Sequence, residues 1–158
     1  NPGVIALRGE FAIPGDDERL QVQLDDGAAF VQSRPGRYDL LLVDGYDERG
    51  IPAVLSTQAF YDDCRDALAP GGVMSVNLFS TDAQAHFGKI RQSFGDSAVM
   101  LEEPKMSNRV AFAWSGDPGG PGPIDSGAVL AALPDEAGRQ LGPGFARLAQ
   151  ALEEAGLR

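Results

Sequence analysis

Polar residues follow three apolar segments of this 158-residue sequence, at the points where strands are expected to end. The segments lead into Asp25-Asp26-Gly27, into Asp44-Gly45-Tyr46-Asp47, and to Asn77. Ligands of open α/β sheets bind at the carboxyl ends of strands, so these positions are candidates for a binding or catalytic site. A carboxylate there can accept hydrogen bonds from a ligand, or it can cap the helix that follows. Both interpretations stay open for Asp25.

The pair Asp44 and Asp47 points most clearly to function. Two carboxylates three residues apart on one loop repel each other unless a cationic group lies between them. The formal net charge of −10 is compatible with a cationic small substrate, which a negative field attracts, although solubility alone is the simpler explanation. The same charge argues against nucleic acid as a partner, because phosphates recruit Lys and Arg.

The elements that would position these residues alternate between helix and strand. Apolar spacing predicts a helix with Val4, Leu7 and Phe11 facing inward. A strand over residues 20–24 and a helix over residues 28–32 follow. The apolar run within residues 38–43 predicts a strand that is buried on both faces, as in parallel sheets.

The following elements continue the alternation. Ser56 or Thr57 is expected to cap a helix with Phe60, Cys64 and Leu68 on one stripe, followed by a strand over residues 73–79. Asp82 begins another helix, and strands over residues 97–101 and 108–114 form an antiparallel pair. This order predicts a Rossmann-like α/β fold of the S-adenosylmethionine-dependent methyltransferase type, whose sheet is mostly parallel with a terminal antiparallel strand pair.

The C-terminal third differs in composition. Residues 116–125 contain little besides Gly and Pro, which predicts a linker or exposed loop. Asp125 can cap a helix after this linker, and apolar residues from Phe145 to Leu152 predict a last amphipathic helix. We therefore divide the chain into a partial Rossmann-like domain (1–115), a linker (116–125) and a helical extension (126–158).

The sequence has one cysteine and one histidine, which limits the disulfides and metal sites that it can form. The lone cysteine, Cys64, excludes an intrachain disulfide and a cysteine metal cluster, and it is expected in the core of a cytoplasmic protein. His86, the lone histidine, is expected on the surface, and no metal site is predicted. No apolar run reaches the length of a membrane span, and residues 1–3 lack the features of a signal peptide.

Several motifs in the first 115 residues share their order and spacing with one family. These are residues 1–7 (Asn-Pro-Gly-Val-Ile-Ala-Leu), Asp26-Gly27, the loop of residues 44–53, Phe60-Tyr61, and residues 68–73 (Leu-Ala-Pro-Gly-Gly-Val). They resemble motifs of spermidine synthase-like aminopropyltransferases. The resemblance implies transfer of an aminopropyl group from decarboxylated S-adenosylmethionine to a polyamine such as putrescine. It implies no metal, no tightly bound cofactor, and a homodimer or strand-sharing assembly.

The resemblance also implies residue roles. Asp44 would be the general base that takes the proton of the attacking amine. Asp47 would hold a cationic amine, with Tyr46 and Asn77 near the acceptor. The nucleoside side would consist of four residues: Asp26 would accept from the adenine amino group, and Gly27, Pro52 and Ala53 would line the base.

The sequence departs from the family pattern in three places. The Gly-rich motif, the acidic residue that holds the ribose and the first two strands are absent from the sequence, so residues 1–158 alone are expected to be inactive. Gly45 and Tyr46 replace two serines of the loop, and Glu48 replaces a proline. Residues 104–108 (Pro-Lys-Met-Ser-Asn) replace a stretch with a tyrosine that helps the diamine, and the identity of the acceptor therefore stays open. A methyltransferase acting with S-adenosylmethionine, or a non-catalytic binding module, are the alternatives on the same fold.

Overall fold

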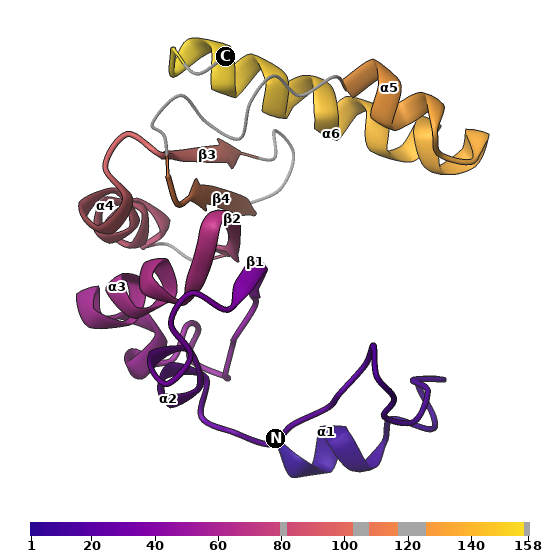
Figure 1. Cartoon of the computed structure of the whole chain (residues 1–158), viewed down its shortest axis with the longest axis vertical. Coiled ribbons are helices and arrows are strands. Elements are labelled where there is room, and N and C mark those ends of the chain that lie inside the picture. Colours follow the sequence, from indigo (N-terminus) through magenta and orange to yellow (C-terminus); the bar gives the residue numbers. More distant parts are fainter. Residues whose placement is uncertain (80–81, 103–107, 117–125, 157–158) are drawn as a thin grey trace.

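A computed structural model describes residues 1–79, 82–102, 108–116 and 126–156 (Figure 1). Its elements are, in chain order, α1 (Pro2–Ala6), α2 (Gly27–Gln32), β1 (Tyr38–Val43), the 3-10 helix η1 (Ala53–Ser56), α3 (Gln58–Ala67), β2 (Leu68–Asn77), α4 (Ala83–Phe94), β3 (Ala98–Glu102), β4 (Arg109–Trp114), α5 (Ser126–Ala131) and α6 (Asp135–Glu154). The alternation of helices and strands between α2 and β4 confirms the predicted order for that part of the chain.

The sheet has the strand order β1-β2-β4-β3. β1 is parallel to β2, and β4 is antiparallel to both β2 and β3. Three strands therefore run in one direction and β4 alone is reversed, which confirms a mostly parallel sheet with an antiparallel pair. Consequently β1, β2 and β3 end, and β4 begins, at the same edge of the sheet.

Helices cover the two faces of the sheet unequally. On one face, α2, α3 and α4 pack around a core that includes Cys64, Met74 and Ile90, all with no exposed surface. On the other face, Leu148 and Leu152 of α6 are among the residues that pack against Trp114 and its neighbours. Figure 1 shows α3 and α4 along one side of the sheet and α6 near β3. The prediction that Cys64 lies in the core is confirmed, and burial raises the pKa of its thiol to about 12.

Local sequence signals explain how the central helices begin. The Asp26 side chain caps α2, and the Thr57 hydroxyl accepts a 3.0 Å hydrogen bond from the Phe60 amide at the start of α3. β2 begins at Leu68, earlier than predicted, and includes the Pro-Gly-Gly sequence. A Cβ atom at Gly72 would lie 2.6 Å from the Tyr38 carbonyl oxygen, so the absence of a side chain lets the two strands approach where their register shifts.

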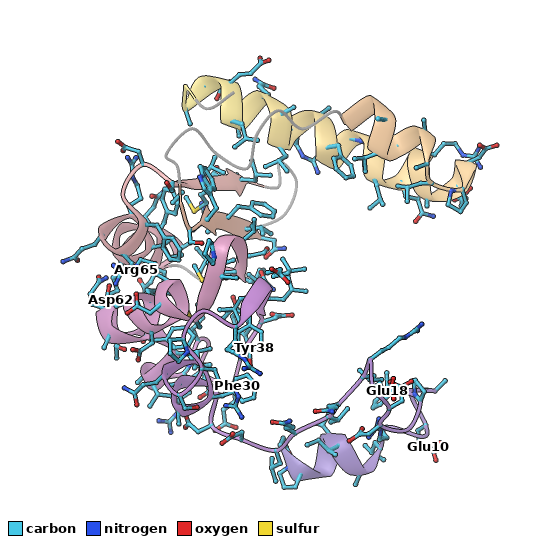
Figure 2. All side chains as sticks on the ribbon, viewed as in Figure 1. Glu10, Glu18, Phe30, Tyr38, Asp62 and Arg65 are labelled. Carbon is cyan, nitrogen blue, oxygen red and sulfur yellow. The ribbon has the colours of Figure 1, made fainter. Side chains whose placement is uncertain are left out.

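The N-terminal predictions are wrong in two respects. Val4, Leu7 and Phe11 are 50–62% exposed rather than inward-facing. Residues 20–24 form no strand, because no strand in the described part of the chain pairs with them and a lone strand leaves its backbone groups unpaired. Figure 2 shows Glu10 and Glu18 on this N-terminal segment, apart from the sheet.

The prediction that the strand over residues 38–43 is buried on both faces is wrong for β1. Leu41 and Val43 pack against the core, whereas Leu40 and Leu42 are 57% and 69% exposed. The reason is position: β1 is an edge strand, whereas the α6 residues pack in the cluster around Val99 of β3 and Trp114 of β4.

His86 is buried, at 8% exposed, so its predicted surface location is also wrong. It lies on α4 with its Nδ1 atom 2.9 Å from the Tyr61 hydroxyl of α3. The last helix, α6, begins before the predicted stripe, whereas Asp125 and residues 117–124 of the predicted linker lie outside the described residues. Within the described chain, no helix is both long and apolar enough to cross a membrane.

Candidate active site

Asp44 and Asn77 meet at the carboxyl edge of the sheet. Val43 and Val76 are register partners in the parallel β1–β2 pair, so the next residue of each strand is brought alongside the other. The Asn77 side-chain amide donates a 3.0 Å hydrogen bond to Asp44 Oδ1. This bond fixes the orientation of the carboxylate, and the exposed position of Asp44 leaves its other oxygen accessible to a substrate.

Tyr46 locks the loop after β1 onto the end of β2. Its hydroxyl donates to the Asn77 carbonyl oxygen at 2.8 Å and accepts from the Phe79 amide at 2.6 Å. Burial raises the pKa of Tyr46, the hydrogen bond from Phe79 opposes this, and the charge of Asp44 adds to the rise. The phenol therefore stays protonated and keeps its donor role at neutral pH.

A cavity of about 330 Å³ opens beside these residues and is lined by Tyr46, Asn77, Phe79 and Asn108. Asn77 Oδ1 and Asn108 Oδ1 are buried and have no hydrogen-bond partner among the described residues. Sequence reasoning assigned no role to Phe79 or Asn108. The direction of β4 was the available signal for Asn108, because an antiparallel strand begins at the edge where its parallel neighbours end.

Asp47 is held by its own turn. Its Oδ1 atom accepts a 2.7 Å hydrogen bond from the Arg49 amide, and its backbone pairs with Gly50. Gly50 has a φ of +118°, a conformation that side chains disfavour. Asp47 is exposed, and no hydrogen bond joins it to Asp44 or Asn77 within the described residues. That Asp44 and Asp47 hold one cation between them stays a prediction.

The residues expected to bind a nucleoside gather around η1. The Asp26 carboxylate accepts from the amides of Ala28 and Ala29 at 2.9 and 3.1 Å, so it acts as a helix cap. Pro52 precedes η1 and Ala53 is its first residue. A Cβ atom would lie 3.5 Å from the Leu55 side chain at Gly27 and 2.6 Å from it at Gly45. The Leu55 side chain therefore lies between the start of α2 and the loop after β1.

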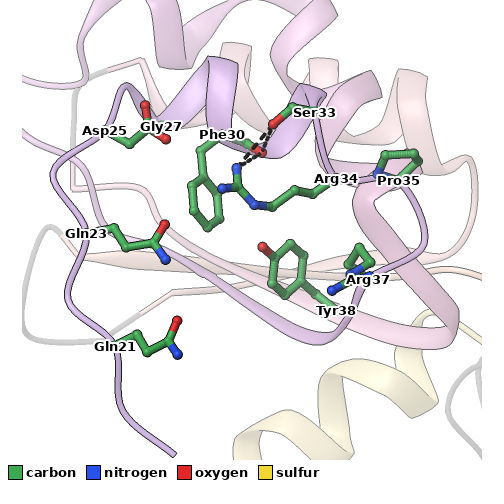
Figure 3. Close-up of a pocket in the computed structure, with 10 residues that line it drawn as sticks. All are labelled: Gln21, Gln23, Asp25, Gly27, Phe30, Ser33, Arg34, Pro35, Arg37 and Tyr38. Atoms are coloured by element: carbon green, nitrogen blue, oxygen red, sulfur yellow. Dashed lines mark hydrogen bonds between the residues drawn. The ribbon is translucent and has the colours of Figure 1, made fainter. Parts of the chain in front are cut away.

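A larger cavity, of about 950 Å³, lies between residues 21–25 and the start of β1 (Figure 3). In Figure 3 the Arg34 side chain approaches Phe30, with its guanidinium carbon 3.7 Å from the ring centroid. The Phe30 and Tyr38 rings stack at 6.1 Å. Tyr38 is the first residue of β1, so this part of the cavity faces the amino end of the strand. We therefore place the candidate active site at Asp44 and Asn77 instead.

Comparison with known proteins identifies the family of the chain. The model of the spermine/spermidine synthase domain family matches residues 7–92, which is more than half of the chain. A polyamine aminopropyltransferase of Chromobacterium violaceum is 32% identical over 121 residues, covering 75% of this chain and 46% of that protein. The chain thus spans about half the length of this curated relative.

Solved structures share the fold. A probable spermidine synthase from Corynebacterium glutamicum matches with a TM-score of 0.61 and 21% identity, over 72% of this chain and 44% of that one. Human methyltransferase-like protein 13, solved in complex with SAH, matches with a TM-score of 0.64 and 19% identity, over 98% of this chain and 67% of that one. These likenesses establish the Rossmann-like architecture, and the match to the family model shows that the chain belongs to the spermine/spermidine synthase domain family.

Proposed function

We propose that the complete protein transfers an aminopropyl group from decarboxylated S-adenosylmethionine to an amine acceptor of the polyamine class, such as putrescine. The observation that carries this proposal is the Asp44–Asn77 hydrogen bond at the carboxyl edge of the sheet, beside a cavity of about 330 Å³. Membership of the spermine/spermidine synthase domain family supports it. The aminopropyltransferase named among the relatives supports it as well.

The reaction needs a base but no metal. The nitrogen lone pair of the acceptor attacks the carbon next to the sulfonium, a C–N bond forms, and the C–S bond breaks with its electron pair going to sulfur. The products are methylthioadenosine and a secondary amine, and the proton lost by the nitrogen goes to Asp44. Asn77 holds Oδ1 of this carboxylate, so the other oxygen can take the proton. Positioning of the two substrates supplies much of the acceleration.

The nucleoside would lie over the residues around η1. Asp26 would accept from the adenine amino group, and Gly27, Pro52 and Ala53 would line the base. On the acceptor side, Asp47 would attract the cationic amine. Tyr46 and Asn77 would define the entrance through their hydrogen bonds at the end of β2.

Replacement of the base tests the proposal in the complete protein. Asp44→Asn removes the proton acceptor but keeps the shape, so we expect aminopropyl transfer to fall roughly 10²- to 10⁴-fold while methylthioadenosine still binds. Asp39→Asn is the matched control, because Asp39 is an exposed carboxylate on β1, the strand that Asp44 directly follows. Transfer that survives in Asp44→Asn at the level of Asp39→Asn would contradict the assignment of the base.

The same assay separates the alternatives. A methyltransferase would bind and use S-adenosylmethionine, whose carboxylate the charge of Asp44 disfavours in this site. We therefore expect decarboxylated S-adenosylmethionine to compete better than S-adenosylmethionine for the nucleoside site. A non-catalytic module would transfer neither an aminopropyl nor a methyl group.

A further inference from the structure

A Gly-Pro-Gly segment lies in the middle of α6. Gly142, Pro143 and Gly144 are all inside this 20-residue helix. Glycine and proline are the poorest helix formers, because glycine loses the most conformational freedom and proline has no N–H group. Pro143 therefore donates no hydrogen bond to the Arg139 carbonyl oxygen, four residues earlier in the helix. Sharp bends of helices occur at such positions, so α6 bends most easily at residues 142–144.

The two halves of α6 pack against different parts of the molecule. In the second half, Leu148 and Leu152 pack in the cluster that contains Trp114 of the sheet. The first half carries α5 instead, since a Cβ atom at Gly138 would lie 3.6 Å from the Leu130 carbonyl oxygen. Figure 1 shows α5 and the first part of α6 reaching beyond the strands. The Gly-Pro-Gly segment thus separates a half that is attached to the sheet from a half that is attached to α5.

A groove of about 360 Å³ lies between α6 and the β3–β4 part of the sheet. None of the residues of α6 is buried, and Leu141, just before the Gly-Pro-Gly segment, is 48% exposed. The apolar residues that line the groove come from both sides: Leu101, Val110, Phe112, Leu141, Phe145 and Leu148. Apolar surface on two facing elements stays in contact with water, so a movement that brings the two sides together is favourable.

We propose that α6 is hinged at residues 142–144, and that α5 and the first half of α6 swing toward the sheet and close the groove. The second half of α6 stays on the sheet as the fixed side of the hinge. Closure brings Leu141 toward Leu101 and Val110 and expels water from between them. The structure has the open arrangement. The hinge goes beyond the proposed aminopropyl transfer and does not depend on it, because its residues lie outside the candidate active site.

The Gly-Pro-Gly segment can be replaced by alanine without a clash. A Cβ atom at Gly142 would lie 4.0 Å from the Leu130 side chain, and one at Gly144 would meet nothing within 4 Å among the described residues. Pro143 is exposed, so alanine there restores the backbone donor without removing a buried contact. The variant with all three residues changed to alanine therefore has a stiffer α6 that keeps the open arrangement.

Distances between two spin labels in the complete protein test the hinge. A label at Gln92→Cys on α4 is the fixed reference, and a label at Ala131→Cys reports on α5, since both positions are exposed. Cys64, the only cysteine of residues 1–158, has no exposed surface and takes up no label, and any further cysteine is first changed to serine. Because α4 packs on the opposite face of the sheet, closure shortens the distance between the labels.

We expect two distances with the original α6 and only the longer one with the triple-alanine variant. A label pair at Gln92→Cys and Gln150→Cys is the matched control, because Gln150 lies on the half of α6 that is attached to the sheet. This pair should give one distance in both proteins. A single α5 distance with the original helix would overturn the inference, and so would two α5 distances that persist in the triple-alanine variant.

A groove variant provides an independent readout that leaves the Gly-Pro-Gly segment intact. Leu141→Glu places a carboxylate on the surface that closure would bury, so we expect the shorter α5 distance to lose most of its population. Val129→Glu on α5 is the matched control, because Val129 is 42% exposed and is not among the lining residues of the groove. Equal populations of the shorter distance in the two variants would contradict closure onto the groove.

Discussion

At the scale of single residues, the Tyr46 hydroxyl connects two strand ends that both contribute to the site. It donates to the Asn77 carbonyl oxygen and accepts from the Phe79 amide, so one oxygen atom holds the loop that carries Asp44 against the end of β2. The family that the loop resembles has serine in this part of the loop, and a serine hydroxyl is too close to its own backbone to reach as far as a phenol. We therefore predict that Tyr46 positions the loop that carries Asp44.

The substitution Tyr46→Phe tests this role. It removes both hydrogen bonds and keeps the ring, so we expect the free energy of unfolding to fall by about 1 kcal/mol. Because the loop with Asp44 loses its attachment, we also expect kcat to fall while methylthioadenosine affinity stays unchanged.

Urea unfolding and steady-state kinetics measure the two effects. Tyr38→Phe is the matched control, since the described residues include no hydrogen-bond partner for the Tyr38 hydroxyl and its ring stacks on Phe30. A kcat for Tyr46→Phe that equals the value for the control would show that the hydroxyl does not position the base.

Part of this site could be predicted from the sequence. Asp44, Tyr46 and Asn77 follow apolar strands, and the parallel pairing of those strands brings them together as expected. Asn108 carries no such local signal, because its place in the site depends on the insertion of β4 between β2 and β3. The turn that engages Asp47 depends on a hydrogen bond between neighbouring residues, which spacing alone does not reveal.

At the scale of elements, helices and strands between residues 27 and 114 were predictable because each has its own cap, stripe or apolar run. The prediction of a strand at residues 20–24 is wrong, because a strand needs a partner strand to satisfy its backbone hydrogen bonds. The local sequence does not show whether such a partner is present. The predicted surface location of His86 is wrong for a related reason. Its polar side chain suggested the surface, but its position on α4 faces Tyr61 of α3.

The contact between His86 and Tyr61 predicts how the packing of α3 on α4 responds to pH. Burial lowers the pKa of His86 below its usual 6.5, the charge of Lys89 adds to this, and Asp82 opposes it. The unfolded chain therefore takes up a proton near pH 6.5 that the folded chain does not take up. We expect the free energy of unfolding to fall as the pH decreases from 7 through this range, and the loss to be complete below the folded-state pKa.

Urea unfolding at several pH values between 7 and 5 measures this loss. His86 is the only histidine of the sequence, and ordinary carboxyl groups titrate at lower pH, so the slope reports on this residue. In His86→Gln the slope over this range should largely disappear. A variant that keeps the slope of the original protein would show that another group is responsible.

At the scale of the whole molecule, the sheet ends in an open edge. β1 pairs only with β2 among the described strands, and its outward residues Leu40 and Leu42 are 57% and 69% exposed. An open strand edge next to an apolar face favours pairing with another strand. The net charge of −10 opposes association of two copies through repulsion, which salt screens.

These opposing effects predict that residues 1–158 self-associate through β1 in a concentration-dependent way, and more strongly as salt is raised. Leu42→Lys places a charge on the open face, so we expect it to shift the chain toward the monomer, as measured by sedimentation velocity at several concentrations. Leu141→Lys is the matched control, because it makes the same change at an exposed leucine of α6. If both variants lower association equally, the loss of an exposed leucine explains the effect and the edge does not. If neither does, the copies meet at another surface. A selective effect of Leu42→Lys would identify the β1 edge as the place where this fold takes up a further strand, because that substitution alone changes the surface beside the open edge.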